Sequence, residues 1–180
     1  TRPLAATTVL AAGARLRIGG REFQAISTPG HSDGHLAFYC SEERLLLCGD
    51  TVLTKITPNI SLWPHGRPNP LADFLRTLDV LGRIAVELAL PGHGPLITVF
   101  GQRLAELRAH HHERLLAVER AAGGGGTAFV VCTAIFPTEQ LNAHQIRFAM
   151  AETLAHLEYL VDVGRLARVD GEQVIYVGKT

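Results

Sequence analysis

The stretch Thr28-Pro29-Gly30-His31-Ser32-Asp33-Gly34-His35 decides how the rest of this 180-residue chain is interpreted. It follows an alternating segment at residues 22–26 and carries two histidines and an aspartate among small, turn-forming residues. Two further segments, Leu47-Cys48-Gly49-Asp50-Thr51 and Leu90-Pro91-Gly92-His93-Gly94, also lead from an apolar strand into a tight turn. Glycines in such turns let the backbone come close to a ligand that the neighbouring histidine or aspartate side chain binds. Two imidazoles and a carboxylate at strand ends suit a divalent ion such as Zn²⁺.

Strands and helices are expected around these turns. Gly19-Gly20 between alternating segments predicts a hairpin, because both glycines accept a positive φ. Asn69-Pro70 predicts a helix start, with Asn as N-cap and Pro at the first helical position. The expected strands are 15–18, 22–26, 35–40, 45–48 and 86–90, and a second amphipathic helix is expected at 102–121.

The sequence changes character after the glycines at 123–126, which we expect to form a flexible connector. A short helix is expected at 128–136 and a longer one at 138–163. Two strands, 166–169 and 173–177, are expected to turn at Asp170-Gly171, a pair typical of a type I′ turn. Helices followed by a β-hairpin are the element order of a winged helix, a variant of the helix-turn-helix.

The three turn segments resemble the last three metal-binding motifs of the metallo-β-lactamase superfamily: the T-P-G-H-S-x-G-H loop, the G-D after a buried strand, and the P-G-H-G loop. The resemblance covers roughly residues 16–96. It implies that His31 is a ligand of the first metal site and His93 a ligand of the second. It also implies that Asp50 is the bridging, catalytic carboxylate, and that His35 orients the ligands without binding metal.

The first motif of that family, H-x-H-x-D-H, is not found in these residues. His110-His111-His112-Glu113 comes nearest and fails the pattern. The fold is therefore expected to be α/β: the second half of an αββα metallo-β-lactamase sandwich at residues 1–108, followed by a C-terminal winged-helix domain at residues 109–180. The lack of an initiator, with Met150 the only methionine, also favours a piece of a longer protein whose N-terminal half is missing here.

The resemblance implies that the parent protein is an enzyme, a binuclear zinc-dependent hydrolase acting through a metal-activated water. Two zinc ions are expected in the complete enzyme, and weak or no zinc binding in this chain, which is expected to be inactive alone. The expected substrate is a thioester or another small ester, because the motifs resemble hydroxyacylglutathione hydrolases. A metal-dependent single-strand RNA nuclease stays open, because the tail resembles the group that includes a β-lactamase-like endoribonuclease. A non-catalytic interaction module stays open too.

Three more residues are candidates for the substrate side. Trp63 and His65 lie in the proline-rich segment 56–70, where they either pack the loop or form a substrate wall. His111 lies on the buried stripe of the helix expected at 102–121, and a substrate contact is the alternative to a packing role.

Composition limits the partners. Lys+Arg and Asp+Glu both number 17, which gives no basic excess for nucleic acid. From Glu113 onward there are six basic and eight acidic residues, so the tail is expected to serve packing or homodimerisation rather than nucleic-acid binding.

No apolar run approaches the roughly 20 residues that span a membrane. Three cysteines, an odd number, favour a reducing compartment and hence the cytoplasm; Cys40 and Cys48 are expected to be small buried side chains.

Overall fold

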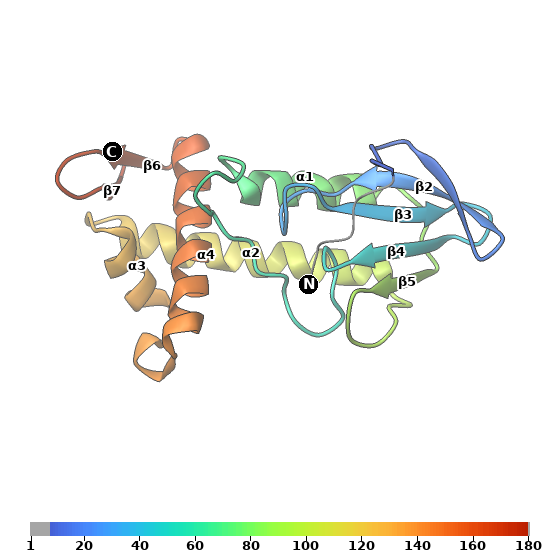
Figure 1. Cartoon of the computed structure of the whole chain (residues 1–180). Coiled ribbons are helices and arrows are strands. Elements are labelled where there is room, and N and C mark those ends of the chain that lie inside the picture. Colours follow the sequence, from blue (N-terminus) through green and yellow to red (C-terminus); the bar gives the residue numbers. More distant parts are fainter. Residues whose placement is uncertain (1–7, 180) are drawn as a thin grey trace.

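The structure is a computed structural model, and it describes residues 8–179 of the chain. Figure 1 shows an elongated molecule with a β-sheet at one end and the helices α3 (Ala128–Ile135) and α4 (Ala143–Asp162) with a small hairpin at the other. The long helix α2 (Phe100–Ala122) reaches between the two ends. No helix in the described part is long and apolar enough to cross a membrane.

The sheet has five strands in the order β1-β2-β3-β4-β5. They are β1 (Arg15–Ile18), β2 (Arg21–Ser27), β3 (Leu36–Cys40), β4 (Leu45–Gly49) and β5 (Leu88–Pro91). The first four pair antiparallel with their neighbours, whereas β5 runs parallel to β4. Parallel strands need a long crossover connection. Here it consists of a loop and the helix α1 (Pro70–Leu81).

The predicted turn at Gly19-Gly20 is confirmed. Ile18 pairs with Arg21, so the two glycines alone connect β1 and β2. Their φ angles of 57° and 83° are the positive values that a type I′ turn requires at both central positions.

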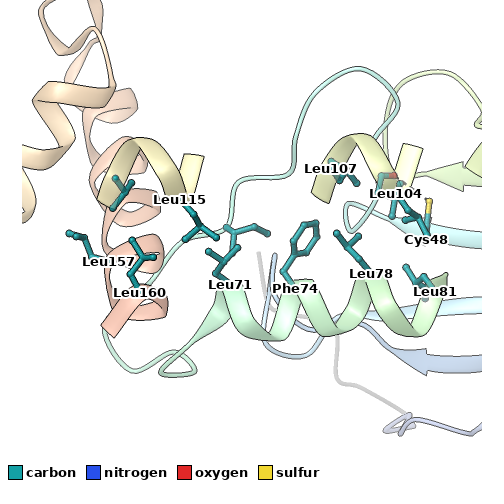
Figure 2. Close-up of a cluster of buried hydrophobic side chains, with 14 of the residues drawn as sticks. Cys48, Leu71, Phe74, Leu78, Leu81, Leu104, Leu107, Leu115, Leu157 and Leu160 are labelled. Carbon is teal, nitrogen blue, oxygen red and sulfur yellow. Dashed lines mark hydrogen bonds between the residues drawn. The ribbon is translucent and has the colours of Figure 1, made fainter. Parts of the chain in front are cut away.

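The helix α1 begins where the sequence predicts. The Asn69 side chain accepts a hydrogen bond of 3.0 Å from the backbone N–H of Ala72, and Pro70 is the first helical residue. Figure 2 shows how the apolar face of α1 joins the two ends of the molecule. Phe74 and Leu78 face Leu107 of α2 (Phe100–Ala122). Leu71 lies toward Leu115, on the side where Leu157 and Leu160 of α4 pack. One apolar core therefore extends from the sheet to the C-terminal helices.

The cysteine prediction is also confirmed, because Cys40 and Cys48 are buried. Burial raises the pKa of the Cys48 thiol to about 12, so it is protonated at neutral pH. A protonated, buried thiol packs as a small apolar side chain and is a poor nucleophile.

Residues 123–179 contain the predicted order of helices followed by a hairpin, although the winged-helix assignment itself stays a prediction. The elements after α2 are α3 (Ala128–Ile135), the 3₁₀ turn η1 (Thr138–Gln140), α4 (Ala143–Asp162), β6 (Leu166–Val169) and β7 (Ile175–Gly178). The predicted boundary between residues 108 and 109 falls inside α2, which is continuous there.

The single helix expected at 138–163 is wrong at its start. The 3₁₀ turn at Thr138–Gln140 is separated from α4 by Leu141 and Asn142. Asn142 then caps α4 in a capping box: its side chain accepts from the backbone N–H of Gln145, and the Gln145 side chain accepts from the backbone N–H of Asn142. These bonds stabilise a helix start at residue 143 rather than a continuous helix.

The last hairpin also differs from its prediction. Val169 pairs with Ile175, so the connection is the five-residue loop 170–174, and neither Asp170 nor Gly171 has a positive φ. The Asp170 carboxylate instead accepts a hydrogen bond of 2.9 Å from Nε of Arg168. The glycines at 123–126, predicted to form a flexible connector, are also fixed to the hairpin. Gly126 exchanges backbone hydrogen bonds of 3.0 and 2.9 Å with Tyr176.

Candidate metal centre

The three turns singled out by the sequence lie at one edge of the sheet. Strand β3 is antiparallel to both β2 and β4, so β2 and β4 run in the same direction, and β5 runs parallel to β4. The carboxyl ends of β2, β4 and β5 therefore meet at the same edge. The segments that follow these ends carry His31, Asp50 and His93.

Asp50 and His93 are neighbours across two of these turns. Nε2 of His93 lies 3.8 Å from Oδ1 of Asp50, and that oxygen is buried without a hydrogen-bond partner among the described residues. The turns are joined by a backbone hydrogen bond of 2.9 Å from Gly92 N–H to Gly49 O. A Cβ atom at position 92 would overlap Asp50 Oδ1, so the glycine leaves the space that the carboxylate occupies. An unpaired carboxylate oxygen beside an imidazole is suited to hold a cation.

The ring of His31 is oriented by a hydrogen bond at Nδ1, the nitrogen that does not face the proposed metal. Its Nδ1 lies 3.0 Å from the backbone carbonyl oxygen of Asn59. Because a carbonyl only accepts hydrogen bonds, Nδ1 carries the proton and donates it, and the neutral ring keeps a lone pair on Nε2. His31 therefore presents Nε2 as a donor atom for a metal ion. Sequence reasoning missed Asn59, and no signal could have found it, because every residue carries a backbone carbonyl.

His35 lies behind the turn that carries Asp50. Its Nδ1 is 2.7 Å from the hydroxyl of Thr28 and 2.9 Å from the hydroxyl of Thr51, and both threonines are buried. Burial lowers the pKa of His35, the neighbouring His31 lowers it further, and Asp50 opposes the shift. Gly49 has a φ of 52°, and a Cβ there would lie 2.6 Å from Nε2 of His35. The ring thus packs directly against the backbone of residue 49, next to Asp50.

A cleft of about 410 Å³ brings His31 together with Trp63 and His65. Trp63 lines this cleft, and its ring meets the Phe148 ring edge-on, at 5.6 Å between centroids. The Arg147 guanidinium lies 4.7 Å from the centroid of the same indole ring. His93 lies beside a second cavity of about 120 Å³ that Leu53, Thr54 and Pro95 also line.

His111 lies away from this cleft. Its side chain is 1% exposed, its ring packs edge-on against Phe74, and its Nδ1 is 3.2 Å from Nε2 of His156. The expectation of a buried stripe on α2 is correct. The alternative of a substrate contact is not supported, because a side chain with this exposure does not face a cleft.

The donor chemistry of the site fits a divalent cation, but the ligand set is incomplete. In residues 8–179, no three His, Cys, Asp or Glu side chains are grouped so that they hold an ion together. Asp50 and His93 offer one oxygen and one nitrogen, both ligand types that Zn²⁺ accepts. A structural zinc site usually has four ligands, so this pair alone does not close a coordination shell.

The chain belongs to the metallo-beta-lactamase superfamily, whose family model matches residues 4–93. A second model, Metallo-beta-lactamase-like, C-terminal domain, matches residues 115–177. The chain is thus a member of a hydrolase-like superfamily whose proteins typically bind metal ions, as the motifs predicted.

Several relatives carry hydrolase names. The probable metallo-hydrolase YqjP of Bacillus subtilis is 29% identical over 141 residues, which cover 75% of this chain and 43% of YqjP. The atrochrysone carboxyl ACP thioesterase of Aspergillus fumigatus is 28% identical over 89 residues, 49% of this chain and 26% of the relative. The hydroxyacylglutathione hydrolase of Ectopseudomonas mendocina is 49% identical over 37 residues, 21% of this chain and 14% of the relative. The chain thus spans less than half the length of these relatives.

Two solved structures share the fold along nearly the whole chain. A metallo-beta-lactamase family protein from Thermus thermophilus superposes with a TM-score of 0.88 at 41% identity, covering 98% of this chain and 56% of that protein. A beta-lactamase domain protein from Burkholderia ambifaria also gives a TM-score of 0.88, at 34% identity, covering 94% and 52%.

Proposed function

We propose that this chain supplies part of the catalytic centre of a binuclear zinc-dependent hydrolase, with His31, Asp50 and His93 as metal ligands. The observation that carries the proposal is the Asp50 Oδ1 atom, which has no hydrogen-bond partner within residues 8–179 and lies 3.8 Å from His93 Nε2, at the sheet edge that also carries His31. When bound, zinc lowers the pKa of a coordinated water toward neutrality and polarises the carbonyl of a substrate.

The residues of the chain have separate tasks in this proposal. Asp50 provides the negative charge that holds the cations, and Gly92 keeps open the space for its carboxylate. His31 offers Nε2 because Asn59 fixes the proton on Nδ1. His35, held by two buried threonine hydroxyls, supports the backbone from which Asp50 projects. Trp63 and His65 form the wall along which a substrate reaches His31.

The proposed substrate is a thioester or another small ester. The names of two relatives, a thioesterase and a hydroxyacylglutathione hydrolase, support this class. The indole of Trp63 provides an apolar surface for an acyl group at the His31 cleft. With at most three ligands shared between two sites, this chain alone is proposed to bind zinc weakly and to be inactive. The remaining ligands would come from an N-terminal half that these residues do not include.

The C-terminal residues 109–180 are proposed to form a winged-helix domain that packs against the catalytic part. Its longest helix, α4, contacts both α1 and α2 through buried side chains such as Leu157 and Leu160. The acidic balance after Glu113 argues against nucleic acid as its partner.

Calorimetric titration with zinc tests the ligand assignment on this chain. Weak binding is expected, and Asp50→Asn or His93→Ala should abolish it, whereas the exposed control His112→Ala should not. Tight binding of two ions by the 180 residues would contradict the incomplete site.

The substrate class is tested on the full natural protein with S-acyl glutathione and single-stranded RNA, with Asp50→Asn as the inactive reference. Cleavage of RNA alone would overturn the ester assignment.

A further inference from the structure

The loop between β4 and α1, residues 50–69, is attached to α4 along much of that helix. Figure 1 shows the loop leaving the sheet and passing beside α4 before α1 begins. Leu62 donates a backbone hydrogen bond of 3.0 Å to Ala151 O, and the Asn69 amide donates one of 3.1 Å to Asp162. The loop contains no helix or strand, so contacts of this kind are what determine its position.

Asn59 connects this attachment to His31. Its backbone carbonyl accepts the Nδ1 proton of His31 at 3.0 Å. Its side-chain amide donates to Oε2 of Glu152 in α4 at 3.2 Å, and its amide oxygen accepts from the hydroxyl of Ser61. Asn59 thus joins a predicted metal ligand, His31, to the carboxylate of Glu152, which lies 93 positions after Asn59 in the sequence.

Glu152 is well placed to hold Asn59. Its side chain is 14% exposed, and its Oε1 lies 3.6 Å from Nε of Arg114 in α2. Arg114 is fixed in turn, with its guanidinium 4.3 Å from the centroid of the Phe136 ring. Glu152 is therefore restrained by two helices, and the hydrogen bond it accepts restrains the backbone at residue 59.

We propose that Glu152 and Asn59 are positioning residues for His31. Glu152 holds the Asn59 side chain, and the Asn59 carbonyl keeps the His31 ring in the tautomer whose Nε2 is free to bind metal. The C-terminal helices thereby set the geometry of a ligand in the catalytic part. The metal-binding consequence rests on the proposed function, whereas the tautomer of His31 does not. Residues that orient a ligand through its second nitrogen typically contribute 10- to 100-fold to metal affinity.

The first test uses the metal-free 180-residue chain and long-range ¹⁵N–¹H NMR of the imidazoles at pH 8.5. The wild type should show His31 protonated at Nδ1 alone. Glu152→Ala should give a mixture of the two tautomers, whereas Glu152→Gln, which still accepts from Asn59, should restore the wild-type pattern. Glu158→Ala is the matched control, because this glutamate of α4 binds Tyr176 and Arg168 instead of the loop. A single Nδ1 tautomer in folded Glu152→Ala would overturn the proposal.

The second test titrates the same variants with zinc alone and follows the His31 resonances. Glu152→Ala should raise the apparent Kd about 10-fold, and Glu152→Gln should stay within about 2-fold of the wild type. If zinc leaves the wild-type His31 resonances unchanged, the ligand assignment fails, and the tautomer comparison still decides the positioning role. If Glu152→Ala does not fold, Asn59→Asp replaces it, because a carboxylate facing Glu152 removes the same hydrogen bond. A wild-type tautomer in Asn59→Asp would then overturn the proposal.

Discussion

The ring of His111 in α2 lies against the ring of His156 in α4, with Nδ1 of His111 3.2 Å from Nε2 of His156. His156 Nδ1 lies 2.8 Å from the backbone oxygen of Glu152, to which it must donate. Its Nε2 therefore accepts, and His111 Nδ1 donates. This arrangement requires His156 to be neutral. The other ring nitrogen of His111, Nε2, is buried without a hydrogen-bond partner among the described residues, which favours the neutral form of that ring as well. Burial accordingly lowers the pKa of His111 to about 3 and that of His156 to about 4.

Acid is expected to destabilise the protein through this pair. Both folded pKa values lie below the ordinary 6.5, so the unfolded chain binds more protons as the pH falls from 6.5 toward 4. The pair's contribution to stability is complete above pH 6.5 and decreases below it, by about 1.4 kcal/mol per pH unit for each ring. This pair alone should therefore lower the free energy of unfolding in urea by about 4 kcal/mol between pH 7.5 and pH 5.

A double variant separates this effect from other titrating groups. His111→Leu with His156→Leu replaces both partners by apolar side chains, so neither is left unpaired. It should remove most of the pH dependence between 7.5 and 5. The control His112→Leu changes an exposed histidine of the same helix and should leave the dependence as it is. An unchanged pH dependence in the double variant would show that the pair is not its source.

Gly30 is expected to be intolerant of any side chain. A Cβ at this position would lie 2.5 Å from Cβ and 2.6 Å from Cα of Phe74, and its φ of 132° is unfavourable for other residues. Phe74 is fully buried in α1, so the helix backbone would have to move away from the loop. Gly30→Ala should lower the free energy of unfolding by about 2–4 kcal/mol.

The matched control for Gly30 is in the same loop. Gly34 is exposed, a Cβ there would meet no atom within 4 Å, and its φ is not positive. Gly34→Ala should therefore change stability by no more than about 0.5 kcal/mol. Urea denaturation compares the two variants, and equal midpoints would contradict the close packing of Gly30 on α1.

The parts of the fold that sequence predicted correctly depend on local interactions. The Gly19-Gly20 turn and the start of α1 are determined by residues within four positions of each other. The break before α4 was missed although its signal, Asn142 with Gln145 three positions later, is also local; the helical spacing of the apolar residues outweighed it. At the last hairpin, the bond between Arg168 and Asp170 competes with the turn that Asp170-Gly171 otherwise favours.

The sequence predicted the side chains of the candidate site and one supporting residue, His35, but not the other supports. His31, Asp50 and His93 follow strand ends and carry groups with recognisable chemistry. Asn59 contributes to His31 through its backbone, for which no residue type is diagnostic. Glu152 reaches Asn59 only because the loop at 50–69 lies against α4, and no pattern in the sequence specifies that docking.

Gly92→Ala is expected to disturb the site and leave the fold nearly unchanged. The added methyl group would overlap Asp50 Oδ1, and this oxygen is the end of a side chain that can rotate. The cost in stability should stay below about 1 kcal/mol. The carboxylate should move away from His93, shift its ¹³C resonance, and bind zinc about 10-fold more weakly. Gly101→Ala, where a Cβ would meet nothing within 4 Å, is the control; equal zinc binding by both variants would contradict this account.

The two long helices differ in their N-caps, and this difference predicts opposite effects of two surface substitutions. The Asn142 side chain accepts the Gln145 N–H at 3.0 Å, so Asn142→Ala should cost about 1 kcal/mol. Val99 precedes α2 without a side-chain cap bond and is 59% exposed, and the first turn of α2 has no acidic residue. Val99→Asp should therefore add about 0.5–1 kcal/mol, by capping and by its charge at the helix N-terminus. Because the sites share no partners, urea unfolding of the double variant should give the sum of the two effects, and destabilisation by Val99→Asp would contradict the uncapped start of α2.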